Sequence, residues 1–201
     1  MNSVLVVVTP AANQDLTSLA LVKAELGITG NAEDTNIGTW IDQASAVIAS
    51  YCNRVFGSEA VRETFRRGDA AKVILSRGPV TVIASVVEDG IELTEDEDFE
   101  CDYASGILTR LCNDYERRWC FRSLVVTYTA GYTLLTTLPD DNERAAQLLV
   151  KGYRSAASRD PLLKSEEIPG VLSQSWWVDS TNKGLPSDVE SLIAPYRFIA
   201  I

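Results

Sequence analysis

Apolar residues recur at intervals of three and four in three segments, and this spacing predicts three main helices. The first segment covers residues 18–26, with Thr17 or Ser18 as its N-cap and Gly27 as its stop. The second covers residues 34–53, with an apolar stripe formed by Ile37, Ile41, Ala44, Val47, Ile48 and Tyr51. The third covers residues 140–158, where Pro139 and the acidic residues that follow it favour a helix start.

Between residues 61 and 132 the helical spacing gives way to short runs of Val, Ile, Thr and aromatic residues, broken by Gly, Pro and Asp. Such runs are typical of antiparallel strands joined by turns. The pairs Asp89-Gly90 and Ser105-Gly106 mark two of these turns, because their residues tolerate positive φ. We expect strands at residues 61–66, 72–75, 80–87, 99–103, 107–111 and 124–129.

Beyond Arg159 the chain loses strong periodicity and is interrupted by prolines and glycines, so we expect only a short helix over residues 187–194. The predicted fold class is therefore α+β. A helical base of about three main helices carries an inserted antiparallel β subdomain and is followed by an irregular C-terminal arm. We place the core at residues 1–158 and an assembly arm at residues 159–201.

The arm contains two consecutive tryptophans, Trp176 and Trp177. Consecutive side chains of an extended chain point to opposite sides, so a lone domain buries only one of them easily. Large aromatic residues often anchor interfaces, and the alternative is that both pack onto the chain's own core. The candidate partner-binding residues of the arm are Trp176, Trp177, Leu192, Tyr196, Phe198 and Ile199.

The net charge is −10, which disfavours a protein whose main task is to grip nucleic acid. Nine acidic residues lie between Val86 and Ala104 without a single Lys or Arg. A calcium loop beginning at Asp96 is disfavoured, because Cys101 and Ile107 stand where an EF-hand requires Gly and Glu. The candidate acidic patch, which either lines a channel or forms a solvated surface, consists of Glu95, Asp96, Glu97 and Asp98.

The sequence lacks the residues on which most enzymes depend. It contains no histidine, no C-x-x-C pair and no glycine-rich phosphate loop, so we expect no catalytic residue, cofactor or metal. A carboxylate-dependent enzyme is disfavoured because the acidic residues have no proton-shuttling partner. The four cysteines are expected to be free buried thiols. No apolar segment is long enough to span a membrane.

One segment supports an alternative function. Residues 110–122 combine arginines with aromatic residues, a mixture that can pair with and stack on single-stranded nucleic acid. The alternatives are an exposed basic edge of a β-hairpin and a strip that forms salt bridges with an acidic surface. A nucleic-acid-binding or packaging accessory protein would use Arg110, Arg117, Arg118 and Arg122 with Tyr115, Trp119 and Phe121.

The order of several short motifs resembles the adaptor, or head-tail connector, proteins of tailed bacteriophages. The early helix (Leu19, Ala20, Val22, Lys23, Leu26) precedes the long helix (Ile41, Ala44, Ile48, Tyr51, Cys52, Asn53, Arg54). The strand region carries Arg77-Gly78-Pro79-Val80, Ile83-Ala84-Ser85-Val86 and Asp89-Gly90. The most characteristic segment is Val126-Thr127-Tyr128-Thr129-Ala130-Gly131-Tyr132, followed by Leu138-Pro139. The end resembles longer members through Gly184-Leu185-Pro186, Leu192 and Pro195-Tyr196-Arg197.

This resemblance implies a structural virion protein without an active site, assembled in the host cytoplasm and located in the phage neck. It implies a homo-oligomeric ring, typically twelve-fold, that docks beneath the portal protein and offers a platform for the stopper or tail-completion protein. DNA would pass through the ring without specific binding. Our own inference is that an acidic lining would help this passage by repelling phosphate.

Overall fold

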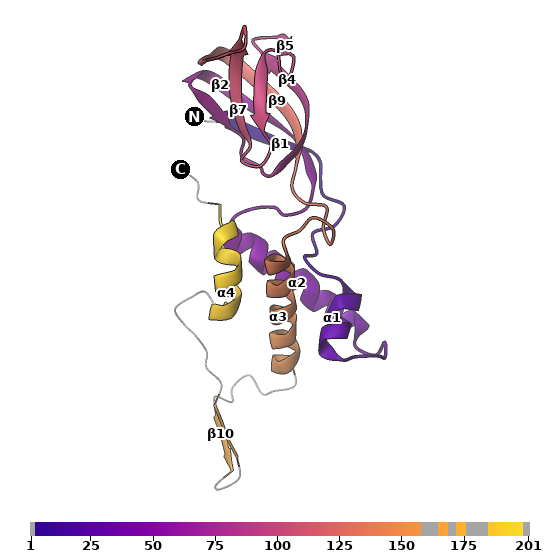
Figure 1. The fold of residues 1–201 in the computed structure, drawn as a ribbon. Coiled ribbons are helices and arrows are strands. Elements are labelled where there is room, and N and C mark those ends of the chain that lie inside the picture. Colours follow the sequence, from indigo (N-terminus) through magenta and orange to yellow (C-terminus); the bar gives the residue numbers. More distant parts are fainter. Residues whose placement is uncertain (1–2, 158–164, 169–171, 176–184, 199–201) are drawn as a thin grey trace. The chain divides into compact units, whose positions relative to one another are not determined.

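The computed structural model describes residues 3–157, 165–168, 172–175 and 185–198. The chain divides into two compact units (Figure 1). The first, which we call the β unit, comprises Met1–Asn13 and Val55–Thr136, and the second, the helical unit, comprises Gln14–Arg54 and Thr137–Ile201. The chain thus combines helices with antiparallel sheets, as the predicted α+β class requires.

The first two helices of the helical unit begin and end close to their predicted bounds. Helix α1 spans Leu19–Leu26, where the Ser18 hydroxyl oxygen accepts a hydrogen bond from the Leu21 amide and Gly27 ends the helix in the left-handed region. Helix α2 spans Asp34–Cys52 and ends at Asn53. Its predicted stripe is buried at Ile37, Ile41, Ala44 and Ile48. Val47 is exposed instead, because it lies beside this stripe rather than within it.

Two further α-helices and a short 3₁₀ turn complete the helical unit among the described residues. Helix α3 spans Asp140–Ala157, helix α4 spans Ser187–Ile193, and the 3₁₀ turn η1 covers Ala194–Tyr196. Helix α3 packs against both α2 and α4. The predicted short helix of the C-terminal region is therefore present, and it contributes Val189 and Ile193 to the buried core, next to Leu185, which precedes the helix.

The C-terminal region also contains two strands that the sequence analysis did not predict. Strands β10 (Ser165–Ile168) and β11 (Leu172–Ser175) pair in antiparallel fashion, so the expectation of irregular structure is wrong for these residues. The strands are only four residues long, too short for an alternating pattern to stand out. Pro169-Gly170, a pair typical of turns, stands between them in the sequence.

The β unit consists of two antiparallel sheets. The larger has the order β1-β2-β9-β4-β5, with bounds Ser3–Thr9, Glu59–Ala70, Trp119–Ala130, Val80–Glu88 and Ile91–Leu93. The smaller has the order β3-β7-β6, and β8 also pairs with β7. Its strands are β3 (Lys72–Ile74), β6 (Phe99–Asp102), β7 (Ile107–Cys112) and β8 (Tyr115–Arg117). All six predicted strands are present, whereas β1, β5 and β8 were not predicted.

The two sheets enclose the core of the β unit. Inward-facing residues of β2, β9 and β4 meet residues of the smaller sheet, so that large side chains such as Trp119, Phe99 and Tyr128 are almost fully buried. The predicted turns connect the strands at Asp89-Gly90 and Gly106, all of which have positive φ.

The position directly after β9, Gly131 of the motif Val126–Tyr132, requires a glycine. Gly131 has a φ of 109°, and a Cβ atom there would lie 2.4 Å from the carbonyl oxygen of Gly57. Its amide donates a hydrogen bond to the Pro79 carbonyl, and the Tyr132 amide donates one to the Phe56 carbonyl. A larger residue cannot occupy this position without displacing the backbone.

Candidate functional site

Three of the candidate partner-binding residues lie in the described part of the chain, and they differ in how firmly they are held. The Tyr196 hydroxyl donates a hydrogen bond to Asp141 over 3.2 Å, and the Phe198 amide donates one to the Cys52 carbonyl over 2.8 Å. Leu192 and Tyr196 are half-buried, whereas the side chain of Phe198 is 44% exposed. Trp176, Trp177 and Ile199 lie outside the described residues.

Further contacts fasten the C-terminal residues to α2. The Tyr51 hydroxyl donates a 2.8 Å hydrogen bond to Glu190, which raises the pKa of Tyr51, and the Arg197 guanidinium lies 5.6 Å from the Tyr51 ring centroid. The Cys52 thiol contacts the Ile193 carbonyl, and burial raises the pKa of this thiol to about 11. Residues 185–198 are thus integrated into the helical unit rather than extending from it as a free arm.

The four residues of the acidic patch lie in and beside the connection between β5 and β6, but they are not equivalent. Asp98 accepts hydrogen bonds from the Thr94 amide and from Arg110, and these bonds lower its pKa. Glu95 accepts a 2.7 Å hydrogen bond from the Tyr103 hydroxyl, which raises the pKa of Tyr103 to about 12. Asp96 and Glu97 are exposed. Only these last two carry charge that the fold itself does not use.

Three of the seven residues of the predicted basic and aromatic strip are buried in the β unit. Arg110 is buried, its Nε lies 3.0 Å from Glu88, and its guanidinium lies 5.9 Å from the Trp119 ring centroid. Trp119 and Phe121 belong to the core. Strand alternation sends these two rings inward while Arg118 and Arg122 remain exposed. Tyr115 and Arg117 of β8 are both exposed. The interpretation of this segment as a stacking platform is therefore wrong for Arg110, Trp119 and Phe121.

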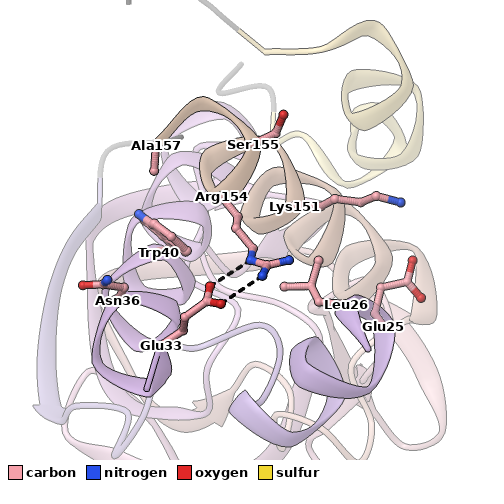
Figure 2. A pocket seen from close by; sticks show the side chains of 9 residues that line it. All are labelled: Glu25, Leu26, Glu33, Asn36, Trp40, Lys151, Arg154, Ser155 and Ala157. Atoms are coloured by element: carbon pink, nitrogen blue, oxygen red, sulfur yellow. Dashed lines mark hydrogen bonds and ion pairs between the residues drawn. The ribbon is translucent and has the colours of Figure 1, made fainter. Parts of the chain in front are cut away.

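The helical unit contains an open pocket of about 850 Å³ that the sequence analysis missed. Figure 2 shows Glu33 and Arg154 facing each other in this pocket, joined by two hydrogen bonds of 2.8 and 2.9 Å. The Arg154 hydrogen bond lowers the pKa of Glu33. Trp40 lies beside them, and Lys151 adds a second cation to the lining. No short motif could have shown this pairing, because its partners are 121 residues apart.

The pocket offers mixed charge and one indole ring, which belongs to Trp40. Among the described residues there is no cluster of three or more metal-ligating side chains. In the same part of the chain no helix combines the length and apolar character needed to cross a membrane.

All four cysteines are free thiols, but the prediction that they are buried holds for only one of them. Cys52 is buried and Cys101 half-buried, whereas Cys112 and Cys120 are exposed. Cys120 faces away from the core because it lies between the inward-facing Trp119 and Phe121 on β9.

Comparison with known proteins gives a consistent result. A protein-family model described as head completion protein matches residues 15–199. Three similar solved structures are described as "Neck of empty GTA particle computed with C6 symmetry", "Neck of native GTA particle computed with C12 symmetry" and "Virion of native gene transfer agent (GTA) particle". Their sequence identities are 20, 16 and 18%, their TM-scores are 0.57, 0.57 and 0.59, and each comparison covers 98% of this chain and 96–97% of the other. No curated protein matches the sequence.

Proposed function

Because the chain belongs to the head completion protein family, we propose that it is a structural protein of a phage neck, where its copies form a ring. The match to the family over residues 15–199 carries this proposal, since it includes nearly all of the helical unit and the larger segment of the β unit, Val55–Thr136. The similarity in fold to chains from particle necks with six- and twelve-fold symmetry supports it. The contribution of the protein is therefore assembly rather than catalysis.

The ring docks beneath the portal protein on one side and receives the stopper or tail-completion protein on the other. Twelve copies match the symmetry of one of the similar necks. Located in the virion neck, the ring extends the DNA channel, and DNA passes through it without specific binding. The net charge of −10 supports passage without retention, because a negative surface repels phosphate. The exposed residues Asp96 and Glu97 are the part of the acidic patch available to line this channel.

The portal contact is assigned to the C-terminal arm within residues 159–201. Residues 185–198 hold the arm to the helical unit through α4, which is hydrogen-bonded to α2, and through η1, which is hydrogen-bonded to α3. Anchors from the arm then reach the portal: the exposed Phe198 ring, and the candidates Trp176, Trp177 and Ile199. Leu192 and Tyr196 are half-buried in this chain and serve mainly to fix the base of the arm.

Electron microscopy and native mass spectrometry of the purified protein, alone and mixed with its portal protein, test this function. We expect closed rings of twelve subunits, or rings that form once the portal is present. A double substitution, Trp176→Ala with Trp177→Ala, should weaken portal binding about 30-fold or more, because aromatic anchors typically contribute about 2 kcal/mol or more. A protein that stays monomeric at high concentration and with the portal would refute the proposal.

A further inference from the structure

The two edges of the larger sheet carry opposite charge. Its order places β1 at one edge and β5 at the other (Figure 1). Beside β1, strand β2 presents three exposed arginines: Arg62, Arg66 and Arg67. The ion pairs found among the described residues of the β unit involve Lys72, Arg77, Arg110 and Arg118, and they leave these three arginines unused. At the other edge, Glu92 of β5 is exposed, and the acidic patch follows it directly in the chain.

Strand register places these charges at the same level and on the same face of the sheet. A single row crosses all five strands through Val4, Thr64, Val125, Val87 and Glu92. Arg62 and Arg66 flank Thr64 on β2, and residues two apart on a strand share a face. Along the strand direction, Arg62 and Arg66 near one edge therefore lie on either side of the row that contains Glu92 at the opposite edge.

The same face is also unusually apolar at its edges. The side chains of Val4 and Val6 on β1 are 63% and 45% exposed, and Val82 on β4 is 55% exposed. Strand β1 contains no charged residue and no proline that would discourage pairing with another chain. Ile91 on β5 is 69% exposed as well, but it lies on the other face because it alternates with Glu92. Soluble proteins normally protect such edges, so an uncharged edge strand of seven residues marks a contact surface.

We propose that the β1–β2 edge of one copy contacts the β5 edge of the next copy of the same chain, and that this contact joins neighbours in the ring. The proposal rests on the ring form of the proposed function. A closed ring needs two different and complementary surfaces on every subunit. Head-to-tail contact brings Arg62 and Arg66 to the neighbour's Glu92, whereas a two-fold dimer through either edge would oppose like charges. The charge pattern therefore favours a second copy in rotational rather than two-fold symmetry.

Two charge-altered variants test this pairing. Arg62→Glu with Arg66→Glu makes both edges acidic, and Glu92→Lys with Thr94→Lys makes both edges basic. Each altered position is exposed, so folding should be retained, which thermal unfolding would check. We expect each variant alone to lose rings, with self-association weakened at least 10-fold. An equimolar mixture should restore rings with an even number of subunits, because the two variants then alternate. Native mass spectrometry distinguishes these states by their mass.

A matched control separates pairing from a general effect of charge. Lys72→Glu with Arg117→Glu changes the net charge as much as the first variant but alters exposed residues of the smaller sheet, so its rings should persist. If the wild-type protein forms rings and either edge variant also forms them alone, this contact is refuted while the proposed function stands. Failure of the mixture to recover rings likewise refutes the pairing. If the wild-type protein forms no ring even with the portal, the proposed function fails and this inference with it.

Discussion

Glu63 gives the sharpest test of how the β unit is held together. Its side chain is completely buried on β2, yet every hydrogen bond to it is donated by another element. The donors are the Ser3 hydroxyl, the Ser76 amide, the Ser76 hydroxyl and the Tyr128 hydroxyl, at 2.5, 3.0, 2.5 and 2.8 Å. This carboxylate thus connects β1, β9 and the segment after β3, and a group that only accepts hydrogen bonds suits four donors.

Glu63→Ala should destabilise the β unit strongly. The substitution leaves the Tyr128 hydroxyl, the Ser76 amide and the Ser76 hydroxyl inside the protein without their acceptor. Each buried donor left unsatisfied costs about 1–3 kcal/mol. Because the two donors of Ser76 are only half-buried, we expect the loss in the free energy of unfolding to lie in the lower part of the range for three donors, at about 3–6 kcal/mol. This is a large part of the roughly 5–15 kcal/mol by which domains are stable. Glu63→Gln should cost less, because the amide retains one accepting oxygen.

Urea unfolding followed by far-ultraviolet circular dichroism and by tryptophan fluorescence measures these differences. Glu100→Ala is the matched control, since it removes an exposed glutamate from a strand of the same unit and should change stability by no more than about 0.5 kcal/mol. Tyr128→Phe removes one donor of the four and should cost about 1 kcal/mol. If the free energies of unfolding of Glu63→Ala and Glu100→Ala differ by less than about 1 kcal/mol, the network does not stabilise the fold as argued.

Three further outcomes follow from the burial of particular groups. Burial and the neighbouring Glu63 raise the pKa of Tyr128 above that of an ordinary tyrosine. The unfolded chain therefore loses this proton first, and stability should fall as the pH rises above about 10. Tyr128→Phe should reduce this alkaline loss, as unfolding at several pH values would reveal. Cys112 and Cys120 should react rapidly with a thiol reagent at neutral pH, whereas the buried Cys52, with a pKa of about 11, should react only on unfolding. Mass spectrometry of partly modified protein identifies the labelled cysteines, and early labelling of Cys52 would contradict this prediction. Truncation after Ser158 removes Leu185, Val189 and Ile193 from the core, so the helical unit should unfold, and a truncated protein with native helix content would refute that role for α4.

The sequence predicted those elements whose signals are local. Helix α2 was predicted because its apolar residues recur at helical spacing along its whole length. The turn at Asp89-Gly90 was predicted because Asp and Gly tolerate positive φ, which both residues adopt. Strand β1 was missed because the run Val4–Val8 does not alternate, and its strand form depends on pairing with β2, about sixty residues away. Its exposed valines carry no core signal that periodicity could detect.

The contacts of the candidate surfaces could not be predicted, because they join residues distant in the sequence. Arg110 looked like part of a basic strip, but β7 turns it toward Glu88 and Asp98, which neutralise it. The pocket pair Glu33 and Arg154 comes from separate helices. Charge along the sequence therefore overstates charge on the surface, and only the fold shows which charged residues remain available to partners.

That distinction assigns the acidic residues to different tasks. Asp98 supports the fold through Arg110 and Thr94. Glu92 stands on the same sheet face as Arg62 and Arg66 of β2 but at the opposite edge. Asp96 and Glu97 are exposed in the connection after β5. Neutralising only Asp96 and Glu97, as Asp96→Asn with Glu97→Gln, should keep rings intact yet slow DNA ejection, if these residues line the channel. Glu92→Gln should weaken ring formation instead, because it removes the charge that faces the neighbour's arginines. Ejection at the wild-type rate from particles that carry the double variant would show that Asp96 and Glu97 form a solvated surface away from the DNA.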